Sequence, residues 1–277
     1  MLAPRPSYPL FECLAVLDAV RIVEYPLPEE LRWGLDLESL ERCRTARTRA
    51  VVLVNPNNPT GGYLNRDQWL RLQGWAASQG LAIIADEVFF DYAWQEQPDR
   101  VSSFDATGEA LAFTLSGLSK AAGLPQMKLG WIHASGPRRL LAEALERLEW
   151  IADAYLPVSA PVQHAAAAWL KLLPQIQASI RERCRENLAT ARGAFSATGG
   201  ARILEPAGGW SVVLDVPRLR SEEEWALHLV ERHGVLVQPG FFYDFEREAF
   251  LVASLLTPTE GFSEGLARLE RALLEHN

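Results

Sequence analysis

The sequence predicts an α/β fold with a mostly parallel sheet in a large domain, followed by a smaller α+β C-terminal domain. Up to about residue 132, short β-rich apolar runs such as "AVVLV" and "LAIIA" alternate with amphipathic segments, which is the pattern of βαβ units. From Pro137 the pattern becomes helical, and after Gly199 short strands and helices alternate again. We therefore expect two domains, at residues 1–165 and 166–277.

The individual elements follow from the spacing of apolar residues and from the Gly, Pro and Asn residues between them. In the large domain we expect strands at 19–27, 50–55, 81–90, 111–117 and 129–134, and a helix at 67–80. The N-terminal "APRPSYP" is expected to be an extended loop. Connecting helices are expected at 138–156, 159–173 and 176–198. The small domain is expected to hold strands at 209–216, 235–240 and 249–256 and helices at 222–234 and 261–277.

Charge and hydropathy exclude two classes of partner. The 277 residues carry a formal net charge of −8, and no basic run forms the patch that binding to a phosphate backbone requires, so no nucleic acid partner is expected. No apolar run reaches membrane-spanning length, and the N-terminus has no signal-peptide pattern. We therefore expect a cytoplasmic protein without a membrane partner.

The cysteines and histidines show no ligand spacing. Cys13, Cys43 and Cys184 are far apart and form no CxxC motif, which indicates neither disulfides nor a zinc site and fits a reducing compartment. The histidines are equally scattered: His133, His164, His228, His233 and His276. The sequence therefore predicts no bound metal.

The stretch at residues 54–64, "VNPNNPTGGYL", follows a strand that reads as buried. Loops at the carboxyl ends of parallel strands are where α/β proteins bind ligands. The same residues are also the ordinary chemistry of a turn, in which Asn58 bonds its own backbone. The motif alone leaves a turn and a binding site equally open.

Two further expected strand ends carry charged side chains. Asp86 and Glu87 follow "LAIIA", where a carboxylate either caps a helix or faces a ligand. Lys120 lies in "SGLSKAAGL", where small and apolar residues surround the amine, which argues against an ordinary solvated lysine. Desolvation of an amine favours its neutral form, which forms Schiff bases with carbonyl groups. A cofactor with a carbonyl group needs this chemistry.

Taken in order, "NPNNPTG", "DEVFFDY" and "SGLSKAAGLPQMKLGW" resemble the three signatures of the class I/II aminotransferases, which are fold-type I enzymes dependent on pyridoxal 5'-phosphate (PLP). The resemblance continues through "GGW" and "VLVQPG". Each motif alone is common, whereas the three together are specific. The resemblance implies that residues 1–165 form a large PLP-binding domain without the family's N-terminal part, and that residues 166–277 form the small domain.

The resemblance also implies roles for the residues at the strand ends. Lys120 is implied to form the internal aldimine with PLP and then to move the proton of the substrate Cα as general base and acid. Asp86 is implied to pair with the pyridine nitrogen and keep it protonated, and Asn58 to donate to the phenolic O3′. Asn55 and Asn57 are interpreted as turn formers.

Four further cofactor-binding residues are implied. Tyr8 falls where the family stacks an aromatic ring on the cofactor, although a tyrosine in a surface loop is the alternative. Lys128 falls where the family usually has an arginine for the phosphate, and lysine lacks the bidentate fork. Ser116 and Ser119 are nearby hydroxyls for the phosphate, with packing as the alternative for Ser119.

Besides Lys128, the chain departs from the family's pattern at two further side chains and at its N-terminal side. Phe89 stands where many members have a tyrosine that donates to O3′, so the aldimine pKa is expected to be higher than with both donors. Val252 occupies the position of the arginine that binds the substrate carboxylate, and Arg247 is a poor substitute. The loop and helix N-terminus that hold the phosphate in the family are not matched. Substrate identity is therefore not predicted.

We predict an aminotransferase that moves an amino group from an amino acid to a 2-oxo acid, with a homodimer as the implied assembly. A lyase or decarboxylase on the same fold would use the same Lys120 and Asp86. A truncated or regulatory protein that binds PLP without turnover is a further alternative. Four aromatic residues are expected either to line an apolar pocket for the substrate side chain or to pack in the core: Trp210, Phe241, Phe242 and Tyr243.

Overall fold

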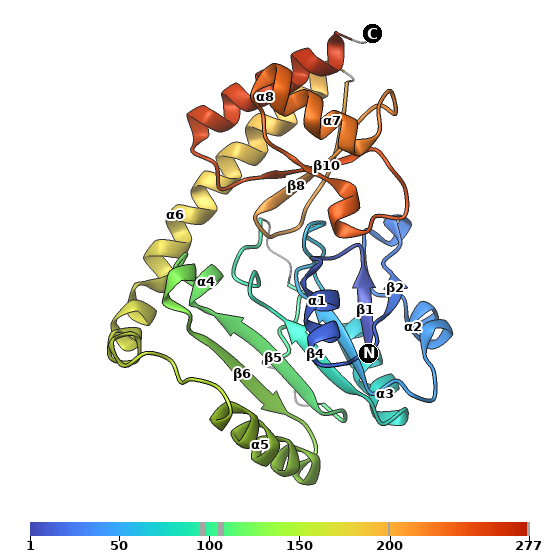
Figure 1. Cartoon of the computed structure of the whole chain (residues 1–277), viewed down its shortest axis with the longest axis vertical. Helices are drawn as coiled ribbons and strands as arrows, with labels where there is room; N and C mark the ends of the chain where they lie inside the picture. The colour runs from blue at the N-terminus through green and yellow to red at the C-terminus, as the bar shows by residue number, and fades with distance from the viewer. Residues whose placement is uncertain (95–97, 105–107, 199, 276–277) are drawn as a thin grey trace.

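Two β-sheets joined by a long helix organise the chain, as the computed structural model shows (Figure 1). The structure describes residues 1–94, 98–104, 108–198 and 200–275. The larger sheet has the strand order β2-β1-β3-β4-β5-β6, and the smaller sheet has the order β7-β8-β10-β9. The strands are β1 (Leu2–Arg5), β2 (Val23–Pro26), β3 (Ala50–Val54), β4 (Ala82–Asp86), β5 (Ala112–Gly117), β6 (Gly130–Ser135), β7 (Arg202–Leu204), β8 (Ser211–Asp215), β9 (Gln238–Pro239) and β10 (Phe250–Ser254).

Helices flank the two sheets and connect them (Figure 1). The α-helices are α1 (Leu10–Leu17), α2 (Leu37–Cys43), α3 (Arg66–Ser78), α4 (Leu118–Ala121), α5 (Arg138–Asp153), α6 (Ala160–Thr198), α7 (Glu222–His228) and α8 (Thr259–Leu274). The shorter helical segments are η1 (Glu29–Leu31), η2 (Pro125–Met127), η3 (Leu229–His233, a π-helix) and η4 (Gly240–Tyr243).

The larger sheet is parallel from β2 to β5, and only β6 runs antiparallel. Val51, Ile83 and Ala112 pair in one row across the sheet and are fully buried on that face, whereas Ile84 and Phe113 on the opposite face are half-buried. The carboxyl ends of β1, β3, β4 and β5 therefore meet at one edge. The predicted α/β fold, with a mostly parallel sheet and a smaller α+β part, is confirmed.

The N-terminal segment differs from the expected extended loop. Leu2–Arg5 forms β1, which lies between β2 and β3 and pairs in parallel with both. Leu2 and Ala3 are buried, so apolar packing holds the strand despite its proline. Tertiary pairing decided this element, which is too short to give a periodic signal.

The connecting helices also differ from the prediction. The segments expected at 159–173 and 176–198 form one helix, α6, with Pro174 inside it. A proline in a helix interior costs about 3 kcal/mol. Burial of Cys184, Leu188 and Ala191 in the small-sheet core offsets this cost. The predicted domain boundary after residue 165 falls within α6, and the division stays a prediction.

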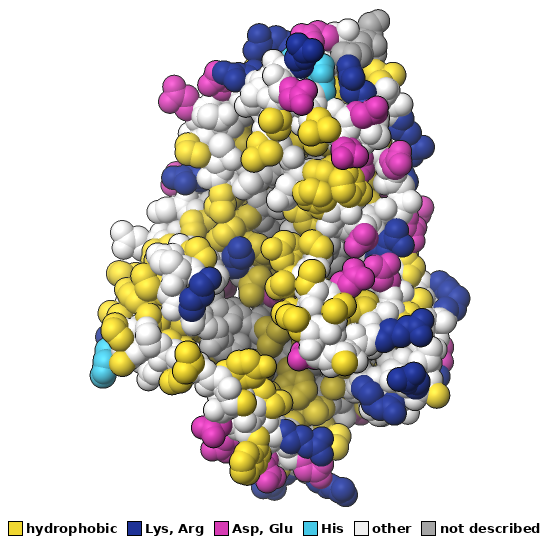
Figure 2. All heavy atoms as spheres, in the orientation of Figure 1, with side chains coloured by type: hydrophobic (Ala, Val, Ile, Leu, Met, Phe, Trp, Pro, Cys, Tyr) yellow, Lys and Arg dark blue, Asp and Glu magenta, His cyan; other side chains and the backbone are white. Residues whose placement is uncertain are grey.

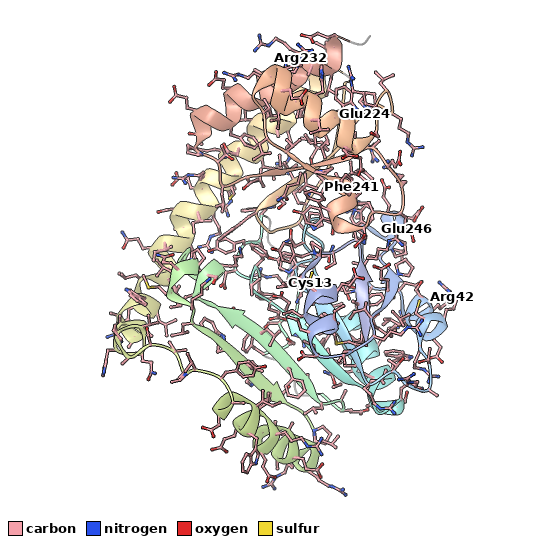
Figure 3. The ribbon with its side chains drawn as sticks, in the orientation of Figure 1. Cys13, Arg42, Glu224, Arg232, Phe241 and Glu246 are labelled. Carbon is pink, nitrogen blue, oxygen red and sulfur yellow. The ribbon has the colours of Figure 1, made fainter. Side chains whose placement is uncertain are left out.

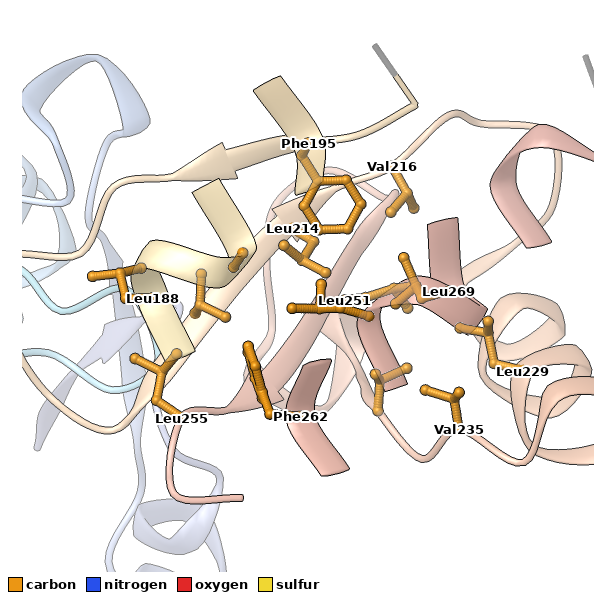
Figure 4. Packing of buried hydrophobic residues seen from close by; sticks show 14 of the residues in the cluster. Leu188, Phe195, Leu214, Val216, Leu229, Val235, Leu251, Leu255, Phe262 and Leu269 are labelled. Atoms are coloured by element: carbon orange, nitrogen blue, oxygen red, sulfur yellow. The ribbon is translucent and has the colours of Figure 1, made fainter. Parts of the chain in front are cut away.

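The two largest apolar clusters lie in different halves of the molecule, one against the larger sheet and one around the smaller sheet. One packs α3 under the larger sheet, with Trp69, Leu72 and Ile83 buried. The other joins α6, β8, β10 and α8, and Figure 4 shows Leu188, Leu214, Leu251 and Phe262 converging there. Phe89, Tyr92 and Trp94 belong to this second cluster although they follow β4, so the segment after β4 ties the two sheets together.

Helix starts are fixed by local capping. Asn65 accepts a hydrogen bond from the Gln68 backbone at 2.8 Å while Gln68 Oε1 accepts one from Asn65 at 3.0 Å, which begins α3 immediately after the turn that follows β3. Among the described residues, we find no helix with the length and apolar character needed to cross a lipid bilayer.

Candidate active site

Four of the sequence-predicted residues stand at neighbouring strand ends of the larger sheet. Tyr8 follows β1, Asn58 follows β3, Asp86 ends β4 and Ser116 lies near the end of β5. These four strands are adjacent in the sheet and parallel (Figure 1). Parallel pairing therefore brings residues far apart in sequence to one edge, where α/β proteins bind ligands.

Asp86 is a mostly buried carboxyl group at this edge. It lies in register with Val54 of β3 and Leu115 of β5, and its Oδ1 accepts a hydrogen bond from the Val88 N–H at 3.1 Å. Burial raises the pKa of Asp86, although the Val88 hydrogen bond and the charge of Lys120 oppose the shift. A buried carboxylate of this kind is stabilised by a cationic N–H partner.

Lys120 lies in α4, the short helix that follows β5 directly. Its Nζ is 5.4 Å from the ring centroid of Phe89 and 5.5 Å from that of Trp210, within the range of cation–π attraction. The Tyr92 hydroxyl donates to the Lys120 carbonyl at 2.7 Å, and Tyr92 is fully buried. The backbone of the lysine is thus fixed while its amine faces two aromatic rings.

The three asparagines after β3 have different surroundings. Asn55 Nδ2 donates to Glu87 Oε1 at 3.1 Å and to the Val101 carbonyl at 3.0 Å. Asn57 Nδ2 donates to Thr60 Oγ1 at 2.9 Å and to the Pro6 carbonyl. Asn58 is half-buried, and its side chain makes no hydrogen bond within the described part of the chain. Asn55 and Asn57 therefore build the turn, whereas the role of Asn58 stays a prediction.

The sequence of the chain matches the model of a known protein family. Residues 1–260 match the family model described as aminotransferase class I and II. The chain belongs to this family. Glutamate-pyruvate aminotransferase AlaA of Escherichia coli (strain K12) is 29% identical over 218 residues, covering 78% of this chain and 49% of the relative. Its counterpart in Haemophilus influenzae is 26% identical over 282 residues, covering 100% of this chain and 70% of the relative.

Solved structures of aminotransferases share the fold. Alanine aminotransferase from Pyrococcus furiosus superimposes with a TM-score of 0.87 at 24% identity, over 99% of this chain and 70% of that one. The match to the family model confirms the predicted aminotransferase family. The chain spans about half the length of the Escherichia coli relative, so only part of the family's length is represented here.

The carboxylate-binding arginine of the family has no counterpart at the predicted position. Val252 is 3% exposed in β10, where it packs among Tyr243, Phe245 and Phe250. Arg247 is held by Asp215 at 2.9 Å and by Glu29 at 3.1 Å, so its guanidinium is already committed to carboxylates of this chain. Val252 carries no charge, and Arg247 is already paired, so neither side chain is available to bind a substrate carboxylate.

The residues predicted to bind the phosphate lie close to Lys120 in the chain. Ser116 and Ser119 are half-buried, whereas Lys128 is exposed. The Leu118 N–H donates to the Leu129 carbonyl at 3.0 Å, so the segment that carries Lys128 returns to the start of α4. The side chains of Ser116, Ser119 and Lys128 make no hydrogen bond within the described residues, and their roles stay predictions.

Tyr8 is 48% exposed at the carboxyl end of β1. The neighbouring Ser7 N–H donates to the Tyr243 carbonyl at 2.9 Å, which joins this strand end to η4 of the small sheet. An exposed ring at the ligand-binding edge agrees with stacking on a ligand and equally with a surface loop. Its stacking role stays a prediction.

The four aromatic residues considered for an apolar pocket separate into three groups. Trp210 covers Lys120, and its indole N–H is buried without a hydrogen-bond partner among the described residues. Tyr243 is core. Phe241 and Phe242 are exposed and contact each other edge to face, and Figure 3 shows Phe241 above Cys13, which lies in α1.

Two further residues support the site, and neither was predicted to bind the cofactor. Tyr92 belongs to the "DEVFFDY" motif, from which no role was predicted for it. Only the fold shows that its hydroxyl donates to the backbone carbonyl of Lys120. Glu87 is buried and accepts hydrogen bonds from Ser102 Oγ at 2.5 Å and from the Ser103 N–H at 2.8 Å. Burial raises the pKa of Glu87, while these donors oppose the shift. Glu87 therefore holds the loop at residues 101–103 against the strand ends.

A cavity of about 1060 Å³ lies apart from these residues, between the two sheets. Neither Asp86 nor Lys120 lines it. Three of its arginines are paired with carboxylates, as in the contact of 2.6 Å between Arg192 and Glu205. The cavity is thus bounded by internal ion pairs and is distinct from the candidate active site.

Proposed function

We propose that this chain is a PLP-dependent aminotransferase that moves an amino group from an amino acid to a 2-oxo acid. One observation carries the proposal: adjacent parallel strands bring the buried Asp86 carboxyl group and the Lys120 amine together. Membership of the aminotransferase family supports it. The names of the relatives, glutamate-pyruvate and alanine aminotransferase, support small amino acids and 2-oxo acids as substrates.

The residues present fit the ring of PLP. Asp86 would pair with the pyridine nitrogen, because its buried carboxyl group has only the Val88 N–H as a described hydrogen-bond donor. Asn58 would donate to O3′ with an amide that the turn leaves unpartnered. Lys120 would hold the aldehyde carbon. When bound, PLP supplies an electron sink for the bonds at the substrate Cα.

The protein's own groups then have separate tasks. Asp86 would hold a proton at the ring nitrogen of a bound cofactor, because a carboxylate there favours the cationic form. The Nζ of Lys120 would take up the proton of the substrate Cα as a general base and give it back as a general acid. Phe89 and Trp210 exclude water from this amine, and Tyr92 fixes its backbone.

The phosphate and the free face of the ring are assigned to less constrained residues. We infer that Ser116, Ser119 and Lys128 contact the phosphate, and that Tyr8 stacks on the ring. Lys128 supplies a charge without a bidentate fork. Phe89 cannot donate a hydrogen bond to O3′, so Asn58 provides that contact from the described side chains.

We infer that two copies of the chain associate. Large apolar side chains are exposed on α1, on β6 and along α5, including Leu17, Ile132, Trp150 and Ile151. Figure 2 shows many hydrophobic side chains over the middle and lower parts of one face, with a few charged side chains among them. Exposed apolar patches of this kind mark interfaces. Sedimentation velocity of the purified chain would show a dimer.

The test of the activity uses the chain's few lysines. The sequence has three, Lys120, Lys128 and Lys171. The protein is mixed with PLP, reduced with borohydride and digested, and the labelled peptide is identified by mass spectrometry. We expect label on Lys120, loss of label in Lys120→Arg and retention in Lys171→Arg, which alters an exposed residue of α6.

Turnover is tested separately. The loaded protein is incubated with alanine or glutamate, with and without a 2-oxo acid, and the products are analysed. Amino-group transfer that requires the 2-oxo acid supports an aminotransferase. Release of carbon dioxide or of an unsaturated product without a 2-oxo acid would instead assign a decarboxylase or lyase. Label on Lys120 without any product would leave a PLP-binding protein.

A further inference from the structure

A cluster of metal-ligating side chains lies in the small-sheet half, remote from the candidate active site. His228 ends α7, His233 ends the π-helical η3, and Glu275 follows α8. One ligand atom from each lies within 4.8 Å of the others. The sequence predicted no metal because its histidines are scattered, and His276, the last of them, lies outside the described residues.

The π-helical turn is what brings the two histidines together. In an α-helix, residues five apart point about 140° away from each other around the axis. The wider π-helical turn, in which hydrogen bonds span five residues, brings such residues towards one face. The Val235 N–H reaches back to the Leu229 carbonyl at 3.0 Å, which closes this segment. The centroids of the His228 and His233 imidazole rings consequently lie 5.1 Å apart.

Two of the ligand-atom distances are close to those of a tetrahedral metal site, and the third is below 4.8 Å. The Nε2 atoms of His228 and His233 are 3.4 Å apart, and His233 Nε2 is 3.7 Å from Glu275 Oε2. A tetrahedral zinc ion with bonds of about 2.05 Å holds its ligand atoms about 3.3 Å apart. A small inward movement of the Glu275 carboxylate, which is 57% exposed, would complete three ligand positions.

Neighbouring groups hold the two rings in place. The Trp225 ring contacts His228 edge to face, with the centroids 6.2 Å apart. Arg268 Nη1 donates to the His233 carbonyl at 3.1 Å, and its charge is balanced by an ion pair with Glu264. The first contact restrains the His228 ring, and the second restrains the backbone of His233. The exposed Glu275 carboxylate is the third candidate ligand.

We propose that His228, His233 and Glu275 bind a divalent transition metal of the zinc class, with water completing the coordination. Two imidazoles and a carboxylate suit Zn²⁺, whereas Mg²⁺ and Ca²⁺ prefer oxygen ligands. The metal links the end of α7 and η3 to the end of α8. Figure 3 shows the neighbouring Arg232 at the top of the small-sheet half, so the site is a surface clamp outside the proposed catalytic centre.

The test titrates Co²⁺ alone into chelator-treated protein. PLP is omitted because its own oxygen atoms bind metals. We expect the visible absorption of four-coordinate Co²⁺ at one equivalent, displaced by Zn²⁺ and not by Mg²⁺. Replacing even an outer partner of a metal site weakens binding about 10- to 100-fold. We therefore expect His228→Ala and His233→Ala each to weaken binding by more than tenfold, and Glu275→Gln to weaken it too.

His164→Ala is the matched control, because His164 is exposed on α6 far along the chain from the cluster. It should leave Co²⁺ binding unchanged. Circular dichroism establishes that each variant is folded, and His228→Gln replaces His228→Ala if the latter is not. Zn²⁺ should also raise the unfolding temperature of the native chain. It should not raise that of the double variant, in which both His228 and His233 are replaced by alanine.

Absence of the Co²⁺ absorption in folded native protein would overturn the proposal, as would equal binding by the double variant. In that case the two imidazoles simply share a hydrogen bond. The readouts use no cofactor, so their outcome is independent of the proposed aminotransferase activity.

Discussion

The Nζ of Lys120 lies 5.5 Å from the centroid of the Trp210 ring, so a residue beside the small sheet covers the amine presented by the large sheet. Trp210 precedes β8 directly, whereas Lys120 follows β5. The site is therefore assembled from both halves of the molecule. Its chemistry depends on their relative position as well as on the residues at the strand ends.

Removing the Trp210 ring should expose Lys120. In Trp210→Ala, we expect the amine to react several-fold faster with an acylating reagent, because one of its two aromatic covers is lost. Trp210→Phe is the control, since it keeps a ring over the amine. Quantitative mass spectrometry of the Lys120 peptide measures the rate, with Lys171 as the internal reference. Equal rates in native and alanine proteins would show that the tryptophan does not shield the amine.

The indole N–H of Trp210 provides a second, separable prediction. It is buried without a hydrogen-bond partner among the described residues, and a bound ligand can use it. A hydrogen bond of this kind contributes about 1 kcal/mol, or roughly fivefold in affinity. Trp210→Phe should weaken binding of an amino acid or of PLP by this factor, as measured by fluorescence titration. Unchanged affinities for both would exclude a ligand contact at the indole nitrogen.

Asp86→Asn should stabilise the cofactor-free protein at neutral pH while weakening PLP binding. Burial raises the pKa of Asp86, so the folded state binds its proton more tightly than the unfolded chain. This contribution to stability is present below the unfolded pKa and is lost as pH rises through the folded pKa. Urea unfolding from pH 4 to 7 should show a steeper loss of stability in the native protein than in the variant. A variant less stable at pH 7 would contradict this account.

Glu87→Ala should destabilise the protein by about 3 kcal/mol, because it leaves buried donors of Asn55, Ser102 and Ser103 without an acceptor. Glu87→Gln keeps most of these contacts and should cost less. Urea unfolding followed by circular dichroism provides the comparison. If both variants lost the same stability, the carboxylate charge and not the hydrogen-bond network would be responsible.

Arg247→Ala should lower the free energy of unfolding by about 1 kcal/mol, with a smaller loss in high salt. Its guanidinium joins Glu29 of the large-sheet half to Asp215 of β8. Unfolding in low and high sodium chloride measures the effect. Substrate affinity should not change, because this guanidinium is already paired. A selective rise in KM for the amino acid would instead identify Arg247 as the carboxylate ligand.

Placing the family's arginine at position 252 should destabilise the protein. In Val252→Arg, a guanidinium would replace an apolar side chain packed against Tyr243 and Phe250, and an unpaired buried charge costs about 3 to 5 kcal/mol. Val252→Leu controls for volume. Thermal unfolding should show a large loss in the arginine variant alone. A stable arginine variant with increased turnover would show that the position still opens towards the substrate.

Much of the larger sheet could be predicted from local patterns, because buried parallel strands are apolar runs that end at polar motifs. Asn58, Asp86 and Lys120 were identified because each follows such a run. The expected loop at the N-terminus was wrong, since β1 is held by pairing with β2 and β3 and not by its own periodicity. The division of α6 at Pro174 was wrong for a similar reason, because packing along the helix outweighs a local breaker.

The sequence by itself determined the family, the parallel sheet and the identity of the candidate catalytic residues, because these depend on residue type and on order along the chain. Tertiary structure alone decided which side chains meet. It placed Trp210 over Lys120, committed Arg247 to Glu29 and Asp215, and brought His228 to His233. Such contacts join residues through the packing of distant elements, for which a single sequence carries no periodic signal.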